Sequence, residues 1–224
     1  MSCSLSIVRL HSLVKPAVVH SEFGHAVPVY FLDTAITENA AADQSLTDHL
    51  YRGDEHYRLC QEVVLGLGGV AMLRALGHQG VQAYHMNEGH SVLVPLALLE
   101  EQTWGRGLHA VTSAEKEAVC QRCVFTTHTP VLAGHDNFSL DLVREVLGDE
   151  RTDFLITTKC CTNGVLSMAS LALEFSRYVN GVSMRQYNAG PCKVLITKWL
   201  HRVANASALR ASYDDDAQYE MSRC

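Results

Sequence analysis

Several features that mark particular protein classes are missing from this 224-residue sequence. No stretch approaches eighteen uninterrupted apolar residues, the length at which a segment becomes a candidate membrane-spanning helix. Residues 1–19 interrupt their apolar positions with Arg9, His11, Lys15 and Pro16, a pattern that does not match the continuous apolar core of a signal peptide. We therefore expect a cytoplasmic protein that neither crosses nor binds a membrane.

Positive charge is also not concentrated anywhere along the chain. The 18 Lys and Arg residues stand against 24 Asp and Glu residues, which gives a formal net charge of −6 at pH 7. No run of basic residues could neutralise successive phosphates along a duplex. Nucleic acid is therefore a disfavoured partner. Internal repeats and low-complexity linkers are missing as well, and a hydrophobic content of 47% is enough for a sizeable core.

Eight cysteines in a chain of this length do not indicate a disulfide-stabilised scaffold. Cys60 and Cys123 lie inside apolar segments, which favours reduced, buried thiols. A zinc site built from Cys120, Cys123, Cys160 and Cys161 is the alternative. It is disfavoured because adjacent cysteines rarely both bind one tetrahedral ion, and because the first pair straddles a predicted helix end and strand start.

Apolar periodicity predicts alternating strands and helices. Strands are predicted at 27–32, 81–85, 124–127 and 179–183, and helices at 54–76, 89–101, from 113, at 139–147 with Ser139 as its cap, and at 165–178. Gly66, Gly68 and Gly69 inside the first helix indicate either that a neighbouring backbone packs closely against it or that it is kinked. Because the crossover lengths suit a parallel sheet, we predict a three-layer α/β domain.

Polar residues follow two of the predicted strands. Asn87, Glu88 and His90 come after the strand at 81–85, and His128 comes after the strand at 124–127. Open α/β sheets bind their ligands at the carboxyl ends of strands, so we expect these side chains to form one site.

A metal-dependent hydrolase is one interpretation of these residues. His85, His90, His128 and His135, with Glu88 and Asp136, are the residue types that bind a catalytic metal. Their spacing does not match a helical metal motif such as His-Glu-x-x-His. A glycosidase is disfavoured too, because nothing in the sequence pairs two of the carboxylates across one bond.

Four segments carry a family resemblance. Residues 50–54 with 57–62, then 85–90 (HMNEGH), 126–130 (TTHTP) and 176–183 (SRYVNGVS) resemble successive signatures of the glycogen/α-glucan phosphorylase family, in the family's order. The resemblance covers about residues 24–185. It implies an α/β fold, namely the parallel-sheet, Rossmann-like N-terminal lobe of a GT-B type glycosyltransferase, present here only in part.

The resemblance also implies a division of the chain into three parts. Residues 1–23 form a divergent N-terminal segment, 24–185 form the partial α-glucan phosphorylase-like domain, and 186–224 form a tail that does not match. We expect this tail to lie outside the packed core. Lys159, Lys193 and Lys198 lie in contexts unlike that of the family's cofactor lysine, so we expect an inactive fragment.

The activity implied by the resemblance is phosphorolysis of α-1,4-glucan ends, with inorganic phosphate as the second substrate and glucose 1-phosphate as the product. The complete family enzyme uses pyridoxal phosphate, whose lysine we do not expect in this chain. His128 matches the family's catalytic histidine, which contacts the sugar beside the developing positive charge. The implied substrate-binding residues are Asn87, Glu88, His90, Thr127 and Asp136. No residue is assigned to cofactor or metal binding, and a homo-oligomer is compatible with the resemblance.

A second interpretation belongs to a different class. The chain could be a non-catalytic carbohydrate-binding or oligomerisation module that keeps the fold of the lobe. The metal-dependent hydrolase is the third interpretation. His85 is favoured as a structural histidine, since it follows an apolar strand.

Overall fold

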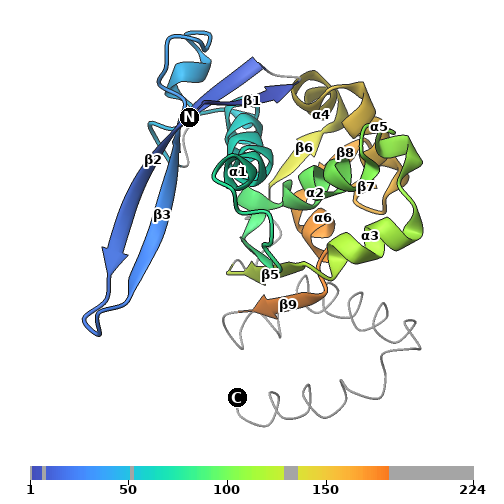
Figure 1. The fold of residues 1–224 in the computed structure, drawn as a ribbon. Helices are drawn as coiled ribbons and strands as arrows, with labels where there is room; N and C mark the ends of the chain where they lie inside the picture. Colours follow the sequence, from blue (N-terminus) through green and yellow to red (C-terminus); the bar gives the residue numbers. More distant parts are fainter. Residues whose placement is uncertain (1, 7–8, 51–52, 129–135, 182–224) are drawn as a thin grey trace, which may run out of the picture.

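The structure is a computed structural model that describes residues 2–6, 9–50, 53–128 and 136–181 (Figure 1). The predicted tail at 186–224 and the loop residue His135 lie outside these described residues. The described part is a mixed α/β fold with one parallel and two antiparallel three-stranded sheets. Within the described ranges, none of the helices combines the length and the apolar character required to span a bilayer.

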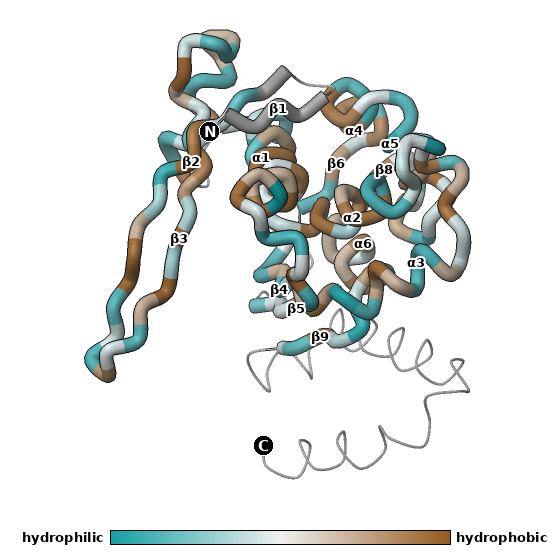
Figure 2. Tube along the Cα trace, in the orientation of Figure 1, coloured by the Kyte–Doolittle hydropathy of each residue, from teal (hydrophilic) through white to brown (hydrophobic). Residues whose placement is uncertain are grey.

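The N-terminal region forms an antiparallel sheet of β1 (Ser2–Ser6), β2 (Arg9–His20) and β3 (Ala26–Asp33). The β2–β3 hairpin projects away from the helices, and both of its strands carry hydrophobic stretches (Figures 1 and 2). The prediction of a strand at 27–32 is confirmed. Strand β2 pairs with β3 from Leu13 to His20. Residues on both sides of position 23, where the predicted N-terminal segment ends, therefore belong to one sheet.

The central sheet is parallel, as predicted. Its strands are β4 (Tyr84–Asn87), β5 (Cys123–Thr127) and β9 (Tyr178–Gly181), in the order β4-β5-β9. Parallel neighbours end at the same edge of a sheet, so the residues after β4 and β5 are brought side by side. The strand predicted at 81–85 begins three residues later than expected, at Tyr84, and ends two residues later, at Asn87.

Helix α1 (Glu55–Ala75) is the longest element of the fold and confirms the helix predicted at 54–76. The Asp54 side chain accepts a hydrogen bond from the Tyr57 backbone N–H at 2.9 Å and so caps its amino end. Beyond its carboxyl end, Gly77 adopts a φ of 86°, a conformation that glycine accepts without steric cost.

The glycines of α1 have different surroundings. A Cβ built on Gly66 would lie 2.7 Å from the Cβ of Leu93 and 3.1 Å from its Cα, so the predicted close approach of a second backbone is confirmed there. A Cβ on Gly69 would meet no described atom within 4 Å, so the same prediction is wrong at Gly69. Leu93 leads directly into α2 (Val94–Thr103), which packs against α1 at this point.

The predicted helix at 89–101 starts later than expected. A 3₁₀ turn, η2 (Gly89–Ser91), precedes α2, and Pro95 occupies the first turn of that helix. Helix α3 (Ser113–Cys120) begins after a capping box in which Thr112 and Glu115 satisfy each other's backbone N–H groups. Helix α4 (Leu140–Leu147) is capped by Ser139, as predicted.

The helix predicted at 165–178 is confirmed over residues 168–174 but is wrong over its first three and its last four residues. Val165–Ser167 forms strand β8, which pairs with β6 (Asn137–Ser139) and β7 (Cys161–Thr162) in a small antiparallel sheet. Helix α6 (Met168–Glu174) follows it. Helix α5 (Asp149–Thr157) and the turns η1 (Asp43–Ser45) and η3 (Leu108–Ala110) were not predicted.

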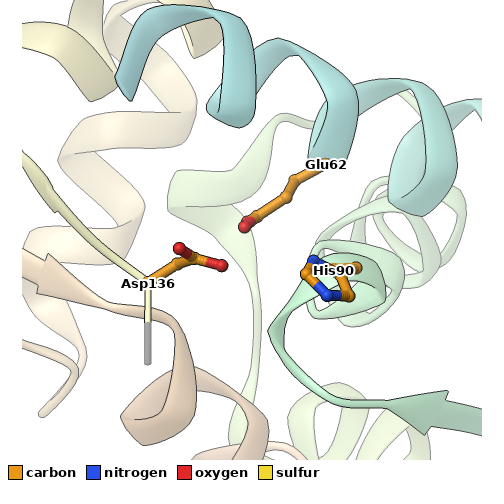
Figure 3. Close-up of side chains that lie close together, drawn as sticks. All are labelled: Glu62, His90 and Asp136. Carbon is orange, nitrogen blue, oxygen red and sulfur yellow. The ribbon is translucent and has the colours of Figure 1, made fainter. Parts of the chain in front are cut away.

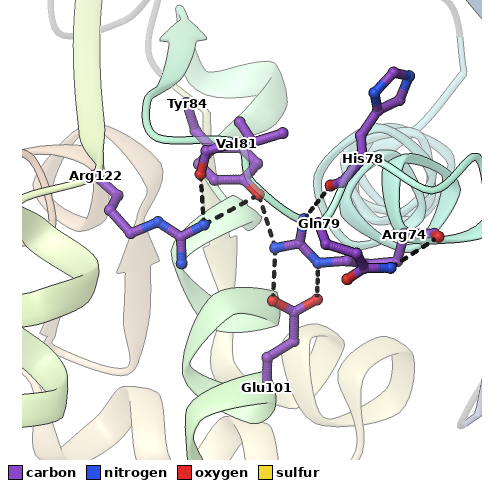
Figure 4. Close-up of polar contacts among 7 residues, drawn as sticks. All are labelled: Arg74, His78, Gln79, Val81, Tyr84, Glu101 and Arg122. Atoms are coloured by element: carbon purple, nitrogen blue, oxygen red, sulfur yellow. Dashed lines mark hydrogen bonds and ion pairs between the residues drawn. The ribbon is translucent and has the colours of Figure 1, made fainter.

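The amino end of β4 is anchored by a polar network (Figure 4). The Arg74 guanidinium donates to both carboxylate oxygens of Glu101 at 2.8 Å and to the Tyr84 hydroxyl at 2.8 Å. Arg122 donates to the Val81 carbonyl at 2.7 Å. Further along the sheet, Met86 and Phe125 are fully buried in the main hydrophobic core. Together these contacts fix β4 and β5, and with them the positions of the last residues of the two strands.

Candidate functional site

Three predicted site residues meet where β4 and β5 end. The Asn87 side-chain oxygen lies 2.6 Å from Nε2 of His128, and the Glu88 carboxylate accepts a hydrogen bond from the His128 backbone N–H. Asn87 and Thr126 are paired in the register of the parallel strands, so one step beyond β5 brings His128 next to Glu88. We call Asn87, Glu88 and His128 the strand-end cluster.

Glu88 has an unusual backbone conformation. Its φ of 59° and ψ of −167° lie in a region that is almost restricted to glycine. Its N–H donates to the Thr126 carbonyl at 2.9 Å, and its carboxylate is held by His128. These contacts hold a strained residue in place, which is common where a side chain must be aimed at a ligand.

The strand-end cluster faces solvent. Asn87 and His128 are exposed, and Glu88 is half-buried. The neighbouring Thr127 is different, because it is buried and its hydroxyl has no hydrogen-bond partner in the part of the chain that the structure describes. An exposed amide in contact with an exposed imidazole, beside a half-buried carboxylate, offers both donors and acceptors to a polyhydroxylated ligand.

His85 is close to this cluster in sequence but has a separate partner. Its Nε2 lies 2.6 Å from the Thr126 hydroxyl. This contact agrees with the interpretation of His85 as a structural histidine. Strand alternation places His85 and Asn87 on the same exposed face of the sheet, with Met86 between them buried on the opposite face, so the two side chains differ in their partners and not in the face they occupy.

A second group of polar residues lies deeper in the fold. Glu62 of α1, His90 of η2 and Asp136, just before β6, each place one ligand-type atom within 4.8 Å of the others (Figure 3). We call these three residues the inner cluster. It contains the predicted residues His90 and Asp136, and Arg58 of α1 forms an ion pair with Asp136.

The electrostatics of the inner cluster are dominated by burial. Glu62 is 2% exposed, and burial raises the pKa of its carboxyl to about 8, although the nearby Arg58 charge opposes this shift. Burial also lowers the pKa of His90; Arg58 lowers it further, while Glu88 raises it. At neutral pH, burial therefore favours the uncharged forms of both groups.

The two clusters are adjacent. Gly89 lies between Glu88 and His90, and a Cβ built on it would lie 3.6 Å from an oxygen of Asp136. Glu88 acts electrostatically on His90. The turn after β4 thus supplies one residue to each cluster.

Sequence reasoning missed Glu62 and Arg58. A signal was present for Glu62, because it lies three residues after Leu59 and therefore on the apolar stripe of α1. For Arg58 no sequence signal indicated Asp136 as its partner, 78 residues away.

The cysteines and the other candidate metal ligands do not form a comparable group. Among the residues that the structure describes, Cys60, Cys120, Cys123, Cys160 and Cys161 are free thiols. Burial raises the pKa of the Cys60, Cys123 and Cys160 thiols to about 12. Within the same described ranges, the inner cluster is the one group of three or more potential metal ligands.

Comparison with known proteins gives sequence relatives but no match to a protein-family model. Over 177 residues the chain is 34% identical to a glycogen phosphorylase of Mycobacterium tuberculosis, covering 70% of this chain and 20% of that protein. It is 34% identical to a maltodextrin phosphorylase of Thermococcus litoralis over 164 residues, covering 70% of this chain and 19% of that protein. A glycogen phosphorylase of Aquifex aeolicus is 28% identical over 175 residues, with 70% and 23% covered. The chain therefore spans about a fifth of the length of these relatives.

Proposed function

This chain contains a partial segment of the glycogen/α-glucan phosphorylase family, and we propose on that basis that its strand-end cluster binds the terminal sugar of an α-1,4-glucan. In the complete enzyme that sugar would be transferred to inorganic phosphate to give glucose 1-phosphate. The proposal takes residues 24–185 as part of the N-terminal lobe of a GT-B type fold. Residues 1–23 and 186–224 are assigned to no part of that lobe.

The observation that carries the proposal is the contact between Asn87 and His128 at the carboxyl ends of adjacent parallel strands. Open α/β sheets bind their ligands at this edge. The amide fixes the orientation of the imidazole, so His128 needs little reorganisation before it meets a sugar hydroxyl. We assign His128 to the reacting sugar, where a fixed dipole stabilises developing positive charge.

The remaining predicted residues take different places in the proposal. Asn87 and Glu88 position His128 and offer hydrogen bonds to sugar hydroxyls. Thr127, His90 and Asp136 lie beneath or beside them, with Thr127 and Asp136 buried, so they support the sugar pocket from below.

Pyridoxal phosphate, the cofactor of the complete family enzyme, does not fit the described residues of this chain. Lys15 pairs with Asp33 on the N-terminal sheet, Lys116 lies over the Phe175 ring, and Lys159 is exposed. None of these lysines contacts the strand-end cluster within the described ranges. The proposal therefore assigns cofactor binding to other parts of the complete enzyme, and no step of it involves this cofactor.

Glucan binding by the full chain tests the proposal. We expect the chain to be retarded in native gels that contain glycogen and to bind maltoheptaose in calorimetry. His128→Ala should weaken binding about tenfold, which corresponds to about 1.4 kcal/mol. The matched control is His109→Ala, because His109 is exposed on η3. Absence of binding, or an equal loss in both variants, would contradict the proposal.

A non-catalytic carbohydrate-binding module is the second candidate function. It is supported by the same cluster and by the poor fit of the described lysines to a cofactor site. The two candidates differ in one product. When the chain replaces the matching segment of a complete phosphorylase, incubation with maltoheptaose, inorganic phosphate and pyridoxal phosphate should release glucose 1-phosphate under the first candidate and none if the chain acts as a binding module alone.

A further inference from the structure

We propose that the inner cluster of Glu62, His90 and Asp136 binds one divalent transition-metal ion, either Mn²⁺ or Zn²⁺. This inference goes beyond the proposed glucan site and does not depend on it. It rests on the convergence of three ligand atoms, on a buried carboxylate that has no hydrogen-bond partner among the described residues, and on the ligand types.

The three ligand atoms come from separate parts of the fold. Glu62 lies on α1, His90 on η2 and Asp136 immediately before β6, and their ligand atoms lie within 4.8 Å of one another (Figure 3). Ligands about 2.1 Å from a tetrahedral ion are roughly 3.4 Å apart. The observed spacing is therefore compatible with a central ion after a small inward movement of long side chains.

The surroundings of Glu62 provide an independent indication that the inner cluster binds a cation. It is 2% exposed, and both of its carboxylate oxygens lack a hydrogen-bond partner among the described residues. Figure 3 shows its side chain extending from α1 toward Asp136 and His90. A buried carboxyl group without partners is strongly destabilising, and a bound cation would supply the interactions it lacks.

Arg58 is the competitor for this site. Its guanidinium pairs with Asp136, whose side chain is 8% exposed, whereas the Arg58 side chain itself is 41% exposed. Because Arg58 reaches solvent, it can withdraw from Asp136 without becoming buried elsewhere. A divalent ion would then take over the role of neutralising Asp136 and would neutralise Glu62 as well.

The ligand types determine the class of ion. One imidazole and two carboxylates suit Zn²⁺ and Mn²⁺, whereas Cu(I) prefers thiolate or thioether ligands, and Ca²⁺ and Mg²⁺ prefer oxygen ligands alone. With three protein ligands, such an ion would keep at least one position for water. It would also link α1 to the turn that carries Glu88.

Manganese binding to the full chain tests the inference, because Mn²⁺ binds thiols weakly and so avoids the eight cysteines. After treatment with EDTA and dialysis, the chain is titrated with Mn²⁺ while free Mn²⁺ is followed by electron paramagnetic resonance. We expect one bound ion per chain. Glu62→Gln should weaken binding at least tenfold. The matched control, Glu145→Gln on α4, should leave binding unchanged because the Glu145 side chain is 69% exposed.

Arg58→Gln provides a second, opposite readout. Removing the competing guanidinium should tighten Mn²⁺ binding severalfold, and circular dichroism would establish that both cluster variants are folded. If Glu62→Gln does not fold, Arg58→Gln decides the question. The inference is overturned if the chain binds no Mn²⁺, if Glu62→Gln binds it as tightly as the unchanged chain, or if Arg58→Gln fails to tighten binding. No glucan is present, so this outcome is independent of the proposed function.

Discussion

The strand-end cluster and the inner cluster contain the same kinds of side chain but satisfy them in different ways. Asn87, Glu88 and His128 lie at the ends of two strands and form hydrogen bonds with one another. Glu62 lies in the middle of a helix, where its carboxyl group is buried without a hydrogen-bond partner among the described residues. Polar residues at the end of a strand can reach a neighbouring strand end, whereas a carboxyl group on a buried helix face depends on what the rest of the fold places opposite it.

This difference has an energetic consequence. In the strand-end cluster, the unfavourable energy lies in the backbone conformation of Glu88. In the inner cluster, it lies in the cost of ionising the buried carboxyl group of Glu62. The first region should therefore respond to changes in backbone freedom. The second should respond to pH and to cations.

The largest expected effect is a pH dependence of stability caused by Glu62. Burial raises the pKa of its carboxyl from 4.5 to about 8, so between these values the folded state holds a proton that the unfolded state has lost. Stability should therefore fall as pH rises, by about 3 kcal/mol between pH 5 and pH 7.5. Urea unfolding in EDTA across this range measures it.

Glu62→Gln is the control for this effect, since glutamine has a similar shape and does not titrate. The difference between the two unfolding curves isolates the contribution of Glu62 from that of other titrating groups. Parallel pH profiles for the two proteins would show that Glu62 is already solvated or paired in solution.

The next effect concerns the ion pair at the edge of the inner cluster. Arg58→Gln should destabilise the metal-free chain by about 2 kcal/mol, because Asp136 would remain buried without its cation. This is less than the cost for a fully buried pair, since Arg58 is partly solvated. The matched change is Arg144→Gln, whose partners Asp149 and Asp153 are both exposed. Removing those surface pairs should change stability by less than about 1 kcal/mol, and equal losses would remove the contrast between buried and exposed pairs.

The smallest effect concerns the backbone of Glu88 in the strand-end cluster. Both Glu88→Ala and Glu88→Gly remove the carboxylate, but only glycine accepts a φ of 59° with a ψ of −167° without strain. The glycine variant should be about 1 kcal/mol more stable than the alanine variant. Thermal unfolding of the pair measures the difference. A more stable alanine variant would mean that this turn relaxes in solution.

Sequence reasoning predicted the parallel sheet and the strand-end cluster because both depend on local patterns. Alternating elements fix the sheet, and strand ends bring Asn87 and His128 together once the strands are neighbours. The inner cluster requires knowledge of which face of α1 meets which loop. Leu59 and Val63 indicate the buried face, but the partners of Glu62 come from distant segments whose placement no local pattern specifies.

The start of the helix predicted at 165–178, which begins only at Met168, had a local signal that was overlooked. Asn163 and Gly164 have φ values of 53° and 76° and form the turn between β7 and β8. An Asn-Gly pair between two short strands is a strong hairpin signal. The apolar residues after this pair fit a helical period as well as a strand. Periodicity alone therefore predicted a helix for Val165–Ser167, which forms a strand.

The central claim, that the strand-end cluster binds an α-glucan, is tested most directly by mapping the bound sugar. The uniformly ¹⁵N-labelled chain is titrated with maltoheptaose, and amide chemical shifts are followed by nuclear magnetic resonance. We predict that the largest changes occur at Asn87, Glu88, Thr127 and His128. Changes confined to the exposed β2–β3 hairpin, or no changes at saturating sugar, would contradict the account.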